Sequence, residues 1–227
     1  MGSEPRSLFV TGTDTGVGKT LVSAALLHTL ARRHARVVGM KPVAAGLVQR
    51  GDAWVSEDAL ALRAASTVRV PAALDNPVAL PEPLSPHLAA ARAGRRIGVA
   101  ELLAAQRALL DLADVVLVEG AGGWRVPLNE RETLADLAVA MAAPVVLVVG
   151  LRLGCLNHAL LTAEAIRADG LTLAGWVANS IDPAMHCRDE NIDTLRTRLA
   201  APLLGVVPWS AAPDPRMITL QLPEDFR

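Results

Sequence analysis

A glycine-rich segment near the start of the sequence has the residue types needed to hold phosphate. Gly16, Gly18, Lys19 and Thr20 follow a short apolar run and precede a long Ala/Leu helical pattern, which is the context that a phosphate-binding loop requires. Glycines let backbone N–H groups turn toward phosphate oxygens, the lysine would reach the β- and γ-phosphates, and the threonine hydroxyl would hold Mg²⁺. The strict pattern G-x-x-x-x-G-K-[ST] is not met, because Thr13 stands where its first glycine belongs. The segment therefore predicts a variant phosphate loop.

Charged residues end or follow two other apolar runs. Lys41 comes directly after the run at 36–40, and Glu119 ends a run that leads into a glycine-rich turn containing Gly122. Ligands of open α/β sheets lie beyond the carboxyl ends of the strands. Lys41 could therefore present a positive charge to a transferring phosphoryl group, and Glu119 lies where a carboxylate would contact Mg²⁺. The plainer alternatives are a solvated lysine and a glutamate that caps a turn.

Three further positions each allow two interpretations. Asp58 is either a second metal ligand or a charge suited to a helix N-terminus, and the residues alone favour the latter. Asn179 could bind a base edge or only form a turn; residues 179–182 lack the lysine of the guanine-recognition pattern, which favours adenine. The backbone amides of residues 154–157, at the start of a helical pattern, could bind a carboxylate or only belong to an ordinary helix start.

Alternating strands and helices must position these residues. Near-continuous Val/Leu runs are typical of strands buried on both faces of a parallel sheet, and they occur at 7–11, 36–40, 114–120, 144–150, 173–179 and 203–208. Helical patterns occur at 19–33, 57–65, 84–93, 99–112, 132–142, 156–168 and 188–199. The sequence thus predicts one α/β domain over residues 1–227, a doubly wound, mostly parallel sheet of the P-loop NTPase kind. Residues 42–56 and 68–86 are expected to be loops, and the tail from about 210 is expected to be partly mobile.

Composition narrows the class of protein. The chain has 227 residues, 52% of them hydrophobic, and a net charge of -1 without a dense Lys/Arg block, so nucleic acid is not an expected partner. Two cysteines, Cys155 and Cys187, are too few for a disulfide framework and fit a reducing compartment. Neither a signal-peptide pattern nor an apolar run of about 20 residues is present. A cytoplasmic protein without a membrane partner is expected.

Several segments, taken in their order and spacing, closely resemble dethiobiotin synthetase. They are FVTGTDTGVGKT at 9–20, KPV at 41–43, PLSPH at 83–87, VEGAGG at 118–123 and GCLNH at 154–158. The resemblance extends from about residue 8 to residue 209. It implies a homodimeric α/β ATPase that closes the ureido ring of dethiobiotin from 7,8-diaminopelargonic acid, CO₂ and ATP, with Mg²⁺.

The resemblance also implies a role for individual residues. Lys19 and Lys41 would stabilise the carbamate and the γ-phosphoryl group, with Thr15 near the carbamate. The Mg²⁺ ligands would be Thr20, Asp58 and Glu119. The residues that contact the nucleotide would be Thr13, Asp14, Gly16, Val17, Gly18, Lys19, Thr20, Glu119, Gly122, Asn179 and Pro208. The residues that contact the substrate would be Thr15, Lys41, Ala45, Gly154, Cys155, Leu156 and Asn157, the last four binding its carboxylate across the dimer interface.

Two departures and two alternatives stand beside this resemblance. Ala45 occupies a position where members of the family often have a hydroxyl residue, and Gly16 replaces an acidic residue found in some of them. The main alternative is a P-loop switch ATPase that acts through a protein partner. Such switches usually have an additional lysine where this chain has Asp14, and often a basic or amphipathic surface that is not found here. An amidotransferase-type synthetase would normally need a glutaminase domain, for which 227 residues leave no room.

Overall fold

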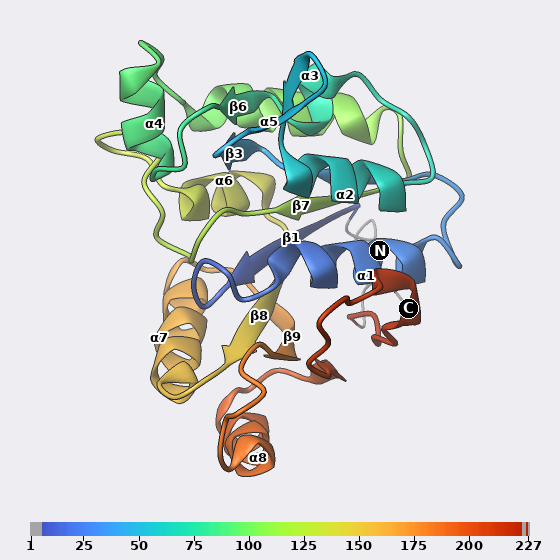
Figure 1. Cartoon of the computed structure of the whole chain (residues 1–227), viewed down its shortest axis with the longest axis vertical. Coiled ribbons are helices and arrows are strands. Elements are labelled where there is room, and N and C mark those ends of the chain that lie inside the picture. The colour runs from blue at the N-terminus through green and yellow to red at the C-terminus, as the bar shows by residue number, and fades with distance from the viewer. Residues whose placement is uncertain (1–5, 224–225, 227) are drawn as a thin grey trace.

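The computed structural model, which describes residues 6–223 and 226, is built around a six-stranded parallel sheet (Figure 1). The strand order is β10-β9-β8-β1-β7-β2, and every neighbouring pair is parallel. The strands are β1 (Ser7–Gly12), β2 (Val37–Met40), β7 (Val115–Glu119), β8 (Val145–Leu151), β9 (Leu173–Ser180) and β10 (Leu203–Val207). The predicted α/β fold with a parallel sheet is confirmed.

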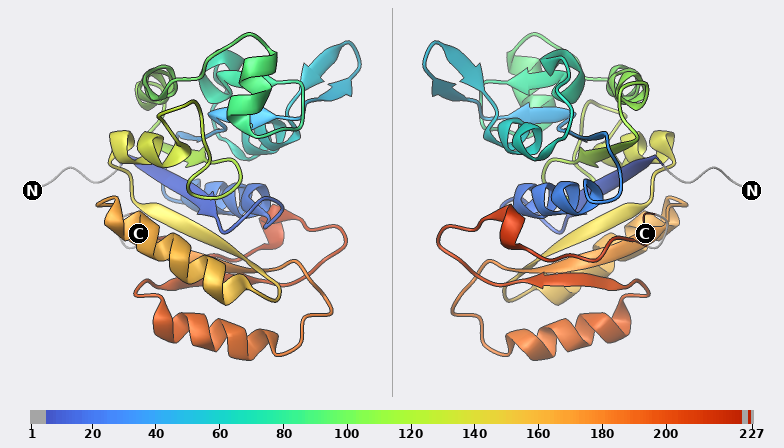
Figure 2. Two further views of the ribbon diagram at one scale, coloured as in Figure 1. Left: turned by 90° about the vertical axis from the view of Figure 1, so that its left-hand side faces the viewer. Right: turned by 90° about the vertical axis from the view of Figure 1, so that its right-hand side faces the viewer.

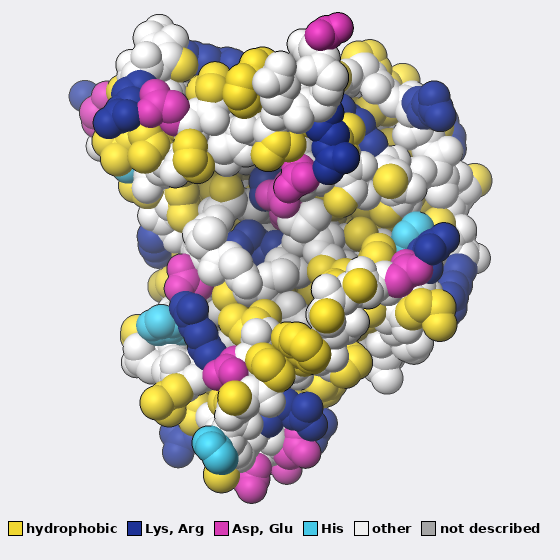
Figure 3. All heavy atoms as spheres, in the orientation of Figure 1, with side chains coloured by type: hydrophobic (Ala, Val, Ile, Leu, Met, Phe, Trp, Pro, Cys, Tyr) yellow, Lys and Arg dark blue, Asp and Glu magenta, His cyan; other side chains and the backbone are white. Residues whose placement is uncertain are grey.

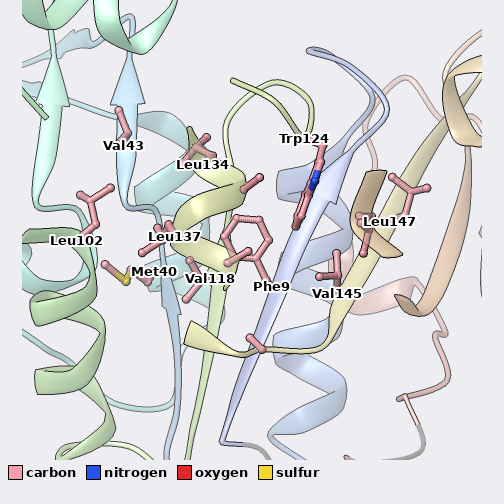
Figure 4. Packing of buried hydrophobic residues seen from close by; sticks show 14 of the residues in the cluster. Phe9, Met40, Val43, Leu102, Val118, Trp124, Leu134, Leu137, Val145 and Leu147 are labelled. Atoms are coloured by element: carbon pink, nitrogen blue, oxygen red, sulfur yellow. The ribbon is translucent and has the colours of Figure 1, made fainter. Parts of the chain in front are cut away.

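The central strands are buried along their whole length, as their continuous apolar runs indicated. Every residue of β1, β7 and β8 is buried. Figure 4 shows part of the core on one face, where the ring of Phe9 lies between Val118 and Trp124. Phe9 and Trp124 meet edge to face with their centroids 6.0 Å apart, a preferred geometry for aromatic pairs. Trp124 thereby anchors the loop that follows the glycine-rich turn after β7.

Helices cover both faces of the sheet, as the two views of Figure 2 show. Leu26, Leu27 and Leu62, from α1 and α2, pack on one face. Leu102 and Leu137, from α5 and α6, pack on the other face together with residues of α7 and α8. The helices are α1 (Lys19–Leu30), α2 (Glu57–Ala65), α3 (Ala72–Asp75), α4 (Pro86–Arg92), α5 (Val99–Leu110), α6 (Leu134–Met141), α7 (Cys155–Ala168) and α8 (Arg188–Arg198), with a 3₁₀ turn η1 (Pro215–Met217).

The two segments predicted to be loops contain short regular elements, so that prediction was wrong in part. Residues 42–56 contain β3 (Val43–Ala45), β4 (Val48–Arg50) and β5 (Ala53–Val55), and residues 68–86 contain α3 and β6 (Val78–Leu80). β3 pairs in parallel with β6, and β4 forms a hairpin with β5. The prolines of 68–86 obscured this pairing, because they break up the local pattern while leaving Val78 and Leu80 buried.

The C-terminal tail, for which partial mobility was expected, folds back over α1. Its 3₁₀ turn η1 lies against α1, and Leu220 and Leu222 are both only 4% exposed. The amide of Gln221 donates to the carbonyl of Leu204 in β10. The tail therefore completes the core on the α1 face instead of extending from the domain.

Candidate functional site

The carboxyl ends of three adjacent strands bring the predicted phosphate loop, Glu119 and Lys41 together. β1 pairs Val10 with Glu119 of β7, and β2 pairs Met40 with Val118. Lys41 follows β2 directly, so its side chain leaves the sheet at the same edge as the loop that follows β1. Figure 3 shows a hollow on the face seen in Figure 1, with both acidic and basic side chains in it.

The phosphate loop winds from β1 to α1 through two glycines with left-handed backbone, Gly16 at φ 75° and Gly18 at φ 87°. Lys19 lies across the loop: its Nζ donates to the carbonyl of Asp14 at 2.9 Å and to that of Gly122 at 2.7 Å. The lysine is 7% exposed and has no carboxylate within salt-bridge distance among the described residues. A buried ammonium held only by carbonyls is suited to accept an anionic partner.

Four charged and hydroxyl side chains meet beneath the loop. Lys41 Nζ contacts Asp58 and Glu119, each at 2.7 Å. Thr20 donates from its hydroxyl to the same two carboxylates, at 2.8 and 2.9 Å. Asp58 comes from the first turn of α2, which Ser56 caps. The structure thus unites the two interpretations of Asp58, because one side chain lies at a helix N-terminus and in the site.

The oxygen ligands at this junction fit a hard divalent cation. Glu119 is fully buried, and its Oε2 has no hydrogen-bond partner among the described residues. A buried carboxylate oxygen without a partner is costly unless a ligand completes it. Mg²⁺ prefers oxygen ligands and usually takes only one or two carboxylates from the protein. Thr20, Asp58 and Glu119, the set that the resemblance implied, are therefore chemically suitable for Mg²⁺.

The charges of this cluster act on one another. Burial by itself lowers the pKa of Lys41, but the charges of Glu119 and Asp58 and the hydrogen bonds to both raise it above its ordinary value. Burial by itself raises the pKa of Asp58, but Lys41 and the Thr20 hydroxyl hold it below its ordinary value. Burial, and next the charge of Lys41, lower the pKa of Lys19 to about 8. Lys41 and Asp58 are therefore charged at neutral pH, whereas Lys19 is close to losing its proton.

Nucleotide binding should be accompanied by proton uptake at high pH. With a pKa of about 8 in the free protein, Lys19 is mostly neutral at about pH 9, and bound phosphates would favour its charged form. Uptake should approach one proton per nucleotide at about pH 9 and fall as pH decreases toward about 7. Calorimetry in buffers of different ionisation enthalpy measures it. Lys19→Arg, which stays charged, should show no such uptake, and equal uptake in both proteins would contradict the role of Lys19.

Two residues that the sequence analysis missed hold the backbone of Lys41. Its amide donates to the carbonyl of Asp75 at 2.7 Å, and its own carbonyl accepts from Asn76 Nδ2 at 2.8 Å. Arg63 of α2 forms a two-pronged ion pair with the buried Asp75 carboxylate. The ion pair thus ties α2, which supplies Asp58, to the segment that holds Lys41. No local pattern reveals these contacts, because they join residues far apart in the sequence.

Asn76→Ala should lower turnover by about 10- to 100-fold while ATP affinity stays within about twofold. Asn76 holds Lys41, the lysine expected to stabilise the γ-phosphoryl group, and a small displacement of a group in such a role is costly. Among the described residues, Asn76 Nδ2 donates to the backbone carbonyls of Lys41 and Val78, and neither carbonyl lies in the phosphate loop. Steady-state kinetics and equilibrium ATP binding, measured side by side, separate the two effects. Unchanged turnover in a variant that folds normally would show that Lys41 needs no such support.

The end of β9 contacts the phosphate loop from the other side. Asn179 Nδ2 donates to the carbonyl of Val17 at 2.8 Å, so one N–H of this amide supports the loop, and its second N–H and its oxygen are left for a base. Pro208 and Trp209, after β10, line a groove of about 540 Å³ together with Ser180. The groove has the size of a small-molecule site and lies beside the residues expected to contact adenine.

In the predicted carboxylate-binding segment at the start of α7, some groups are already engaged in contacts within the protein. Cys155 is 2% exposed, and its amide donates to the carbonyl of Arg152, so neither group is free for a ligand. Gly154 and Asn157 are exposed. Arg152, which the sequence analysis did not single out, forms an ion pair with Asp14 of the phosphate loop. The segment is thus joined to the phosphate site.

Two further residues of the predicted site, Ala45 and Thr15, lie in β3 and in the phosphate loop. Ala45 is half-buried in β3, paired with Leu80. Thr15 is exposed on the phosphate loop, and a side chain at Gly122 would come within 3.5 Å of its hydroxyl. Lys19 and Lys41 are the only two lysines of the whole sequence. Both are buried. All other Lys/Arg positions of the sequence are arginine.

Comparison with known proteins places the chain among ATP-using synthetases. A family model described as an AAA domain matches residues 6–216. The ATP-dependent dethiobiotin synthetase BioD of Aromatoleum aromaticum is 54% identical over 220 residues, which cover 97% of this chain and 98% of that protein. None of the helices in the described part of the chain has both the length and the apolar composition that spanning a bilayer requires.

Solved structures share the fold at low identity. A ParA family ATPase from Chlorobium tepidum gives a TM-score of 0.56 at 13% identity, covering 91% of this chain and 86% of that chain. The septum site-determining protein MinD of Pyrococcus horikoshii, complexed with Mg-ADP, gives 0.54 at 17% identity, covering 89% and 81%. These likenesses show a P-loop NTPase fold and nothing further.

Proposed function

The chain belongs to the family of ATP-dependent dethiobiotin synthetases, and we propose that it closes the ureido ring of dethiobiotin where Lys41 meets Glu119. The reaction joins 7,8-diaminopelargonic acid and CO₂ at the expense of ATP, giving ADP and phosphate. The observation that carries the proposed site is the junction at which Lys41 contacts two carboxylates beside the phosphate loop.

The reaction moves negative charge between the carbamate, the γ-phosphoryl group of ATP and the phosphate that leaves. An amine of the substrate takes up CO₂ as a carbamate, and a carbamate oxygen attacks the γ-phosphorus while the bond to the ADP oxygen breaks. The second amine then attacks the carbamate carbon, and phosphate leaves with the former carbamate oxygen. Each step builds or shifts negative charge, so fixed positive charge and orientation should supply most of the rate enhancement.

Lys19 and Lys41 are suited to different steps of this reaction. Lys19, held only by carbonyls of Asp14 and Gly122, would exchange these contacts for phosphate oxygens. Lys41 is fixed by Asp58 and Glu119 and by its clamped backbone, so it would keep its position while the phosphoryl group moves. A preorganised cation of this kind needs no rearrangement during the reaction.

We propose Thr20, Asp58 and Glu119 as the protein ligands of Mg²⁺. When bound, the metal would neutralise charge on the β- and γ-phosphates. The unpartnered Oε2 of Glu119 supports this assignment. Because Lys41 contacts both carboxylates, the lysine and the metal would share them, which keeps the ammonium next to the phosphates.

We also propose a homodimer with the substrate carboxylate bound near the start of α7. Leu153, directly before this segment, is 97% exposed, and Leu161 in α7, one helix turn after Asn157, is 56% exposed. Exposed leucines of this kind are typical of a covered interface when they gather. Light scattering over a dilution series, with activity measured in parallel, should show turnover falling as the dimer dissociates; a fully active monomer would contradict the interface site.

The proposed reaction is tested by following both products and the fate of oxygen. Phosphate release from ATP should depend on the diamine and bicarbonate, and mass spectrometry should find dethiobiotin. With ¹⁸O-labelled bicarbonate, one labelled oxygen should appear in the released phosphate, because the carbamate oxygen leaves with it. ATP hydrolysis that ignores the diamine would instead favour a switch ATPase that acts through a protein partner.

A further inference from the structure

The outer edge of β2 is closed by side chains and a turn instead of a further strand. β2 is the last strand of the main sheet, so every second backbone N–H along this edge needs a partner outside the sheet. The amides of Val37 and Gly39 donate to the hydroxyls of residues 66–67, at 2.7 and 2.9 Å. The next such amide belongs to Lys41 and donates to the carbonyl of Asp75 at 2.7 Å. The position of the Lys41 backbone therefore depends on where Asp75 lies.

Asp75 is held mainly by one side chain from another helix. It ends α3, a helix of only four residues, and a helix this short is not stable without tertiary contacts. The Asp75 side chain is 3% exposed, so its carboxylate also needs a cationic partner. Arg63 supplies both: its Nε and Nη2 donate to the two carboxylate oxygens at 2.6 and 2.5 Å. Asp75 forms no other ion pair among the described residues, so its anchorage depends on this two-pronged contact.

Arg63 belongs to a helix whose position is fixed by other contacts. This helix, α2, packs so closely on β2 that a Cβ added to Gly39 would lie 2.9 Å from Cβ of Leu62. Ser66, which follows α2, accepts from the amide of Gly39 and donates to the carbonyl of Leu62. α2 is thus supported with or without the ion pair, and Arg63 fastens α3 to this support.

We propose that Arg63 is a positioning residue for Lys41. The guanidinium holds Asp75, the carbonyl of Asp75 holds the amide of Lys41, and the Lys41 ammonium is thereby kept beside Glu119 while the γ-phosphoryl group is transferred. None of these contacts involves a residue of the phosphate loop. The inference rests on the proposed role of Lys41 and adds the residue that sets the position of its backbone.

Arg63→Ala should lower kcat by about 10- to 100-fold, because a displaced cation stabilises the transition state less. The dissociation constant of ATP, and the gain in ADP affinity that Mg²⁺ brings, should change by less than about twofold, since the phosphate loop and Asp58 stay in place. Hydrogen exchange of the Lys41 amide, measured by NMR without nucleotide, should become faster because its acceptor is no longer held. The exchange rate reports on the Lys41 backbone independently of turnover.

Two variants separate positioning from folding. Removing Arg63 alone leaves a buried carboxylate without its cation, which destabilises the chain. Combining Arg63→Ala with Asp75→Asn removes that charge, so stability in urea should recover while kcat stays low. Arg36→Ala is the control for a lost ion pair, because Arg36 pairs with Asp114 at the opposite end of β2. Its kcat should stay within about twofold of the natural value, as is usual for an exposed pair.

A cavity beside the ion pair permits chemical rescue. Arg63 and Asp75 line this cavity together with residues of the connection 64–72, and it measures about 400 Å³. Guanidinium chloride, far below the concentrations that unfold the protein, should bind Asp75 in Arg63→Ala and restore much of the lost kcat and Lys41 amide protection. The natural chain and the double variant should not respond, because one already has its guanidinium group and the other lacks the carboxylate.

The results distinguish the role of Arg63 from the reaction itself. If Arg63→Ala keeps its natural kcat, or if the double variant regains it, the ion pair serves only stability and the proposed positioning is wrong. An unchanged exchange rate of the Lys41 amide, or no response to guanidinium, would overturn it as well, and so would equal losses in kcat and ATP affinity. The proposed ring closure fails separately, if the natural chain forms no dethiobiotin from the diamine, bicarbonate and ATP. The exchange measurement would still test the hold on Lys41 in that case.

Discussion

Replacing Lys41 by methionine should lower the rate of dethiobiotin formation by about 10²- to 10³-fold, the usual effect of removing a preorganised stabilising group. The affinity for ATP should change by less than about threefold, because in the proposed site nucleotide would be held mainly by the loop and its own lysine, Lys19. Lys41 is buried against Asp58 and Glu119, so methionine keeps the packing volume and removes the charge. Turnover kinetics and equilibrium ATP binding measure the two quantities. Equal losses in both would contradict the catalytic role.

The same substitution should destabilise the free protein. Glu119 is fully buried and relies on Lys41 as its cationic partner, and removing one member of a buried pair costs about 3–5 kcal/mol. The double variant Lys41→Met, Glu119→Gln is the matched control, because neutral glutamine needs no cation. Urea unfolding should show stability largely restored in the double variant, while activity stays absent. Restored activity would mean that Lys41 acts only by balancing Glu119.

Replacing Gly18 by alanine should weaken ATP binding by about 100-fold or more, an effect equivalent to about 2.7 kcal/mol. Gly18 has φ 87°, and a Cβ placed there would lie 2.1 Å from Nδ2 of Asn179. That amide is buried and bound to Val17, so it has little freedom to withdraw. The phosphate loop must therefore shift, which moves the amides that would surround phosphate. Calorimetric titration with ATP gives the effect directly.

Gly16→Ala is the matched control for this loop. Gly16 also has a left-handed backbone, at φ 75°, but a Cβ there has nothing within 4 Å. It should suffer only the backbone strain, about 1–3 kcal/mol, and lose correspondingly less affinity than Gly18→Ala. Adding Asn179→Ala to Gly18→Ala should recover part of the loss. Equal effects at both glycines would show that contact with Asn179 is unimportant.

The main sheet could be predicted from the sequence because its signal is local. A strand buried on both faces needs an unbroken apolar run, and each of the six runs became a strand with ends within about two residues of those expected. The small β3–β6 sheet could not be predicted in this way. Its strands are three residues long, one lies among prolines, and their pairing joins Val43 to Val78 across 35 positions.

The same distinction between local and long-range signals applies to the residues of the site. The phosphate loop, Lys41 and Glu119 could be located because each directly follows or ends a buried run, and parallel strands place all such ends at one edge. The clamp on Lys41 by Asp75 and Asn76, and the ion pair of Arg152 with the loop, are tertiary contacts without a local pattern. Asn179, which was expected to contact adenine, lies beside the phosphate loop, and its amide nitrogen donates to the loop.

The confinement of both lysines to the proposed phosphate site has a practical chemical consequence. Reagents that acylate amines usually react with many surface lysines of a protein. This chain has no surface lysine, because its only two lysines are buried in the proposed site. Apart from the terminal amine, Lys19 is the better nucleophile, since its pKa is lowered to about 8 while that of Lys41 is raised. The extent to which Lys19 is acylated would therefore measure how much of the enzyme has nucleotide bound, because the reagent would reach Lys19 only where the phosphate loop is empty.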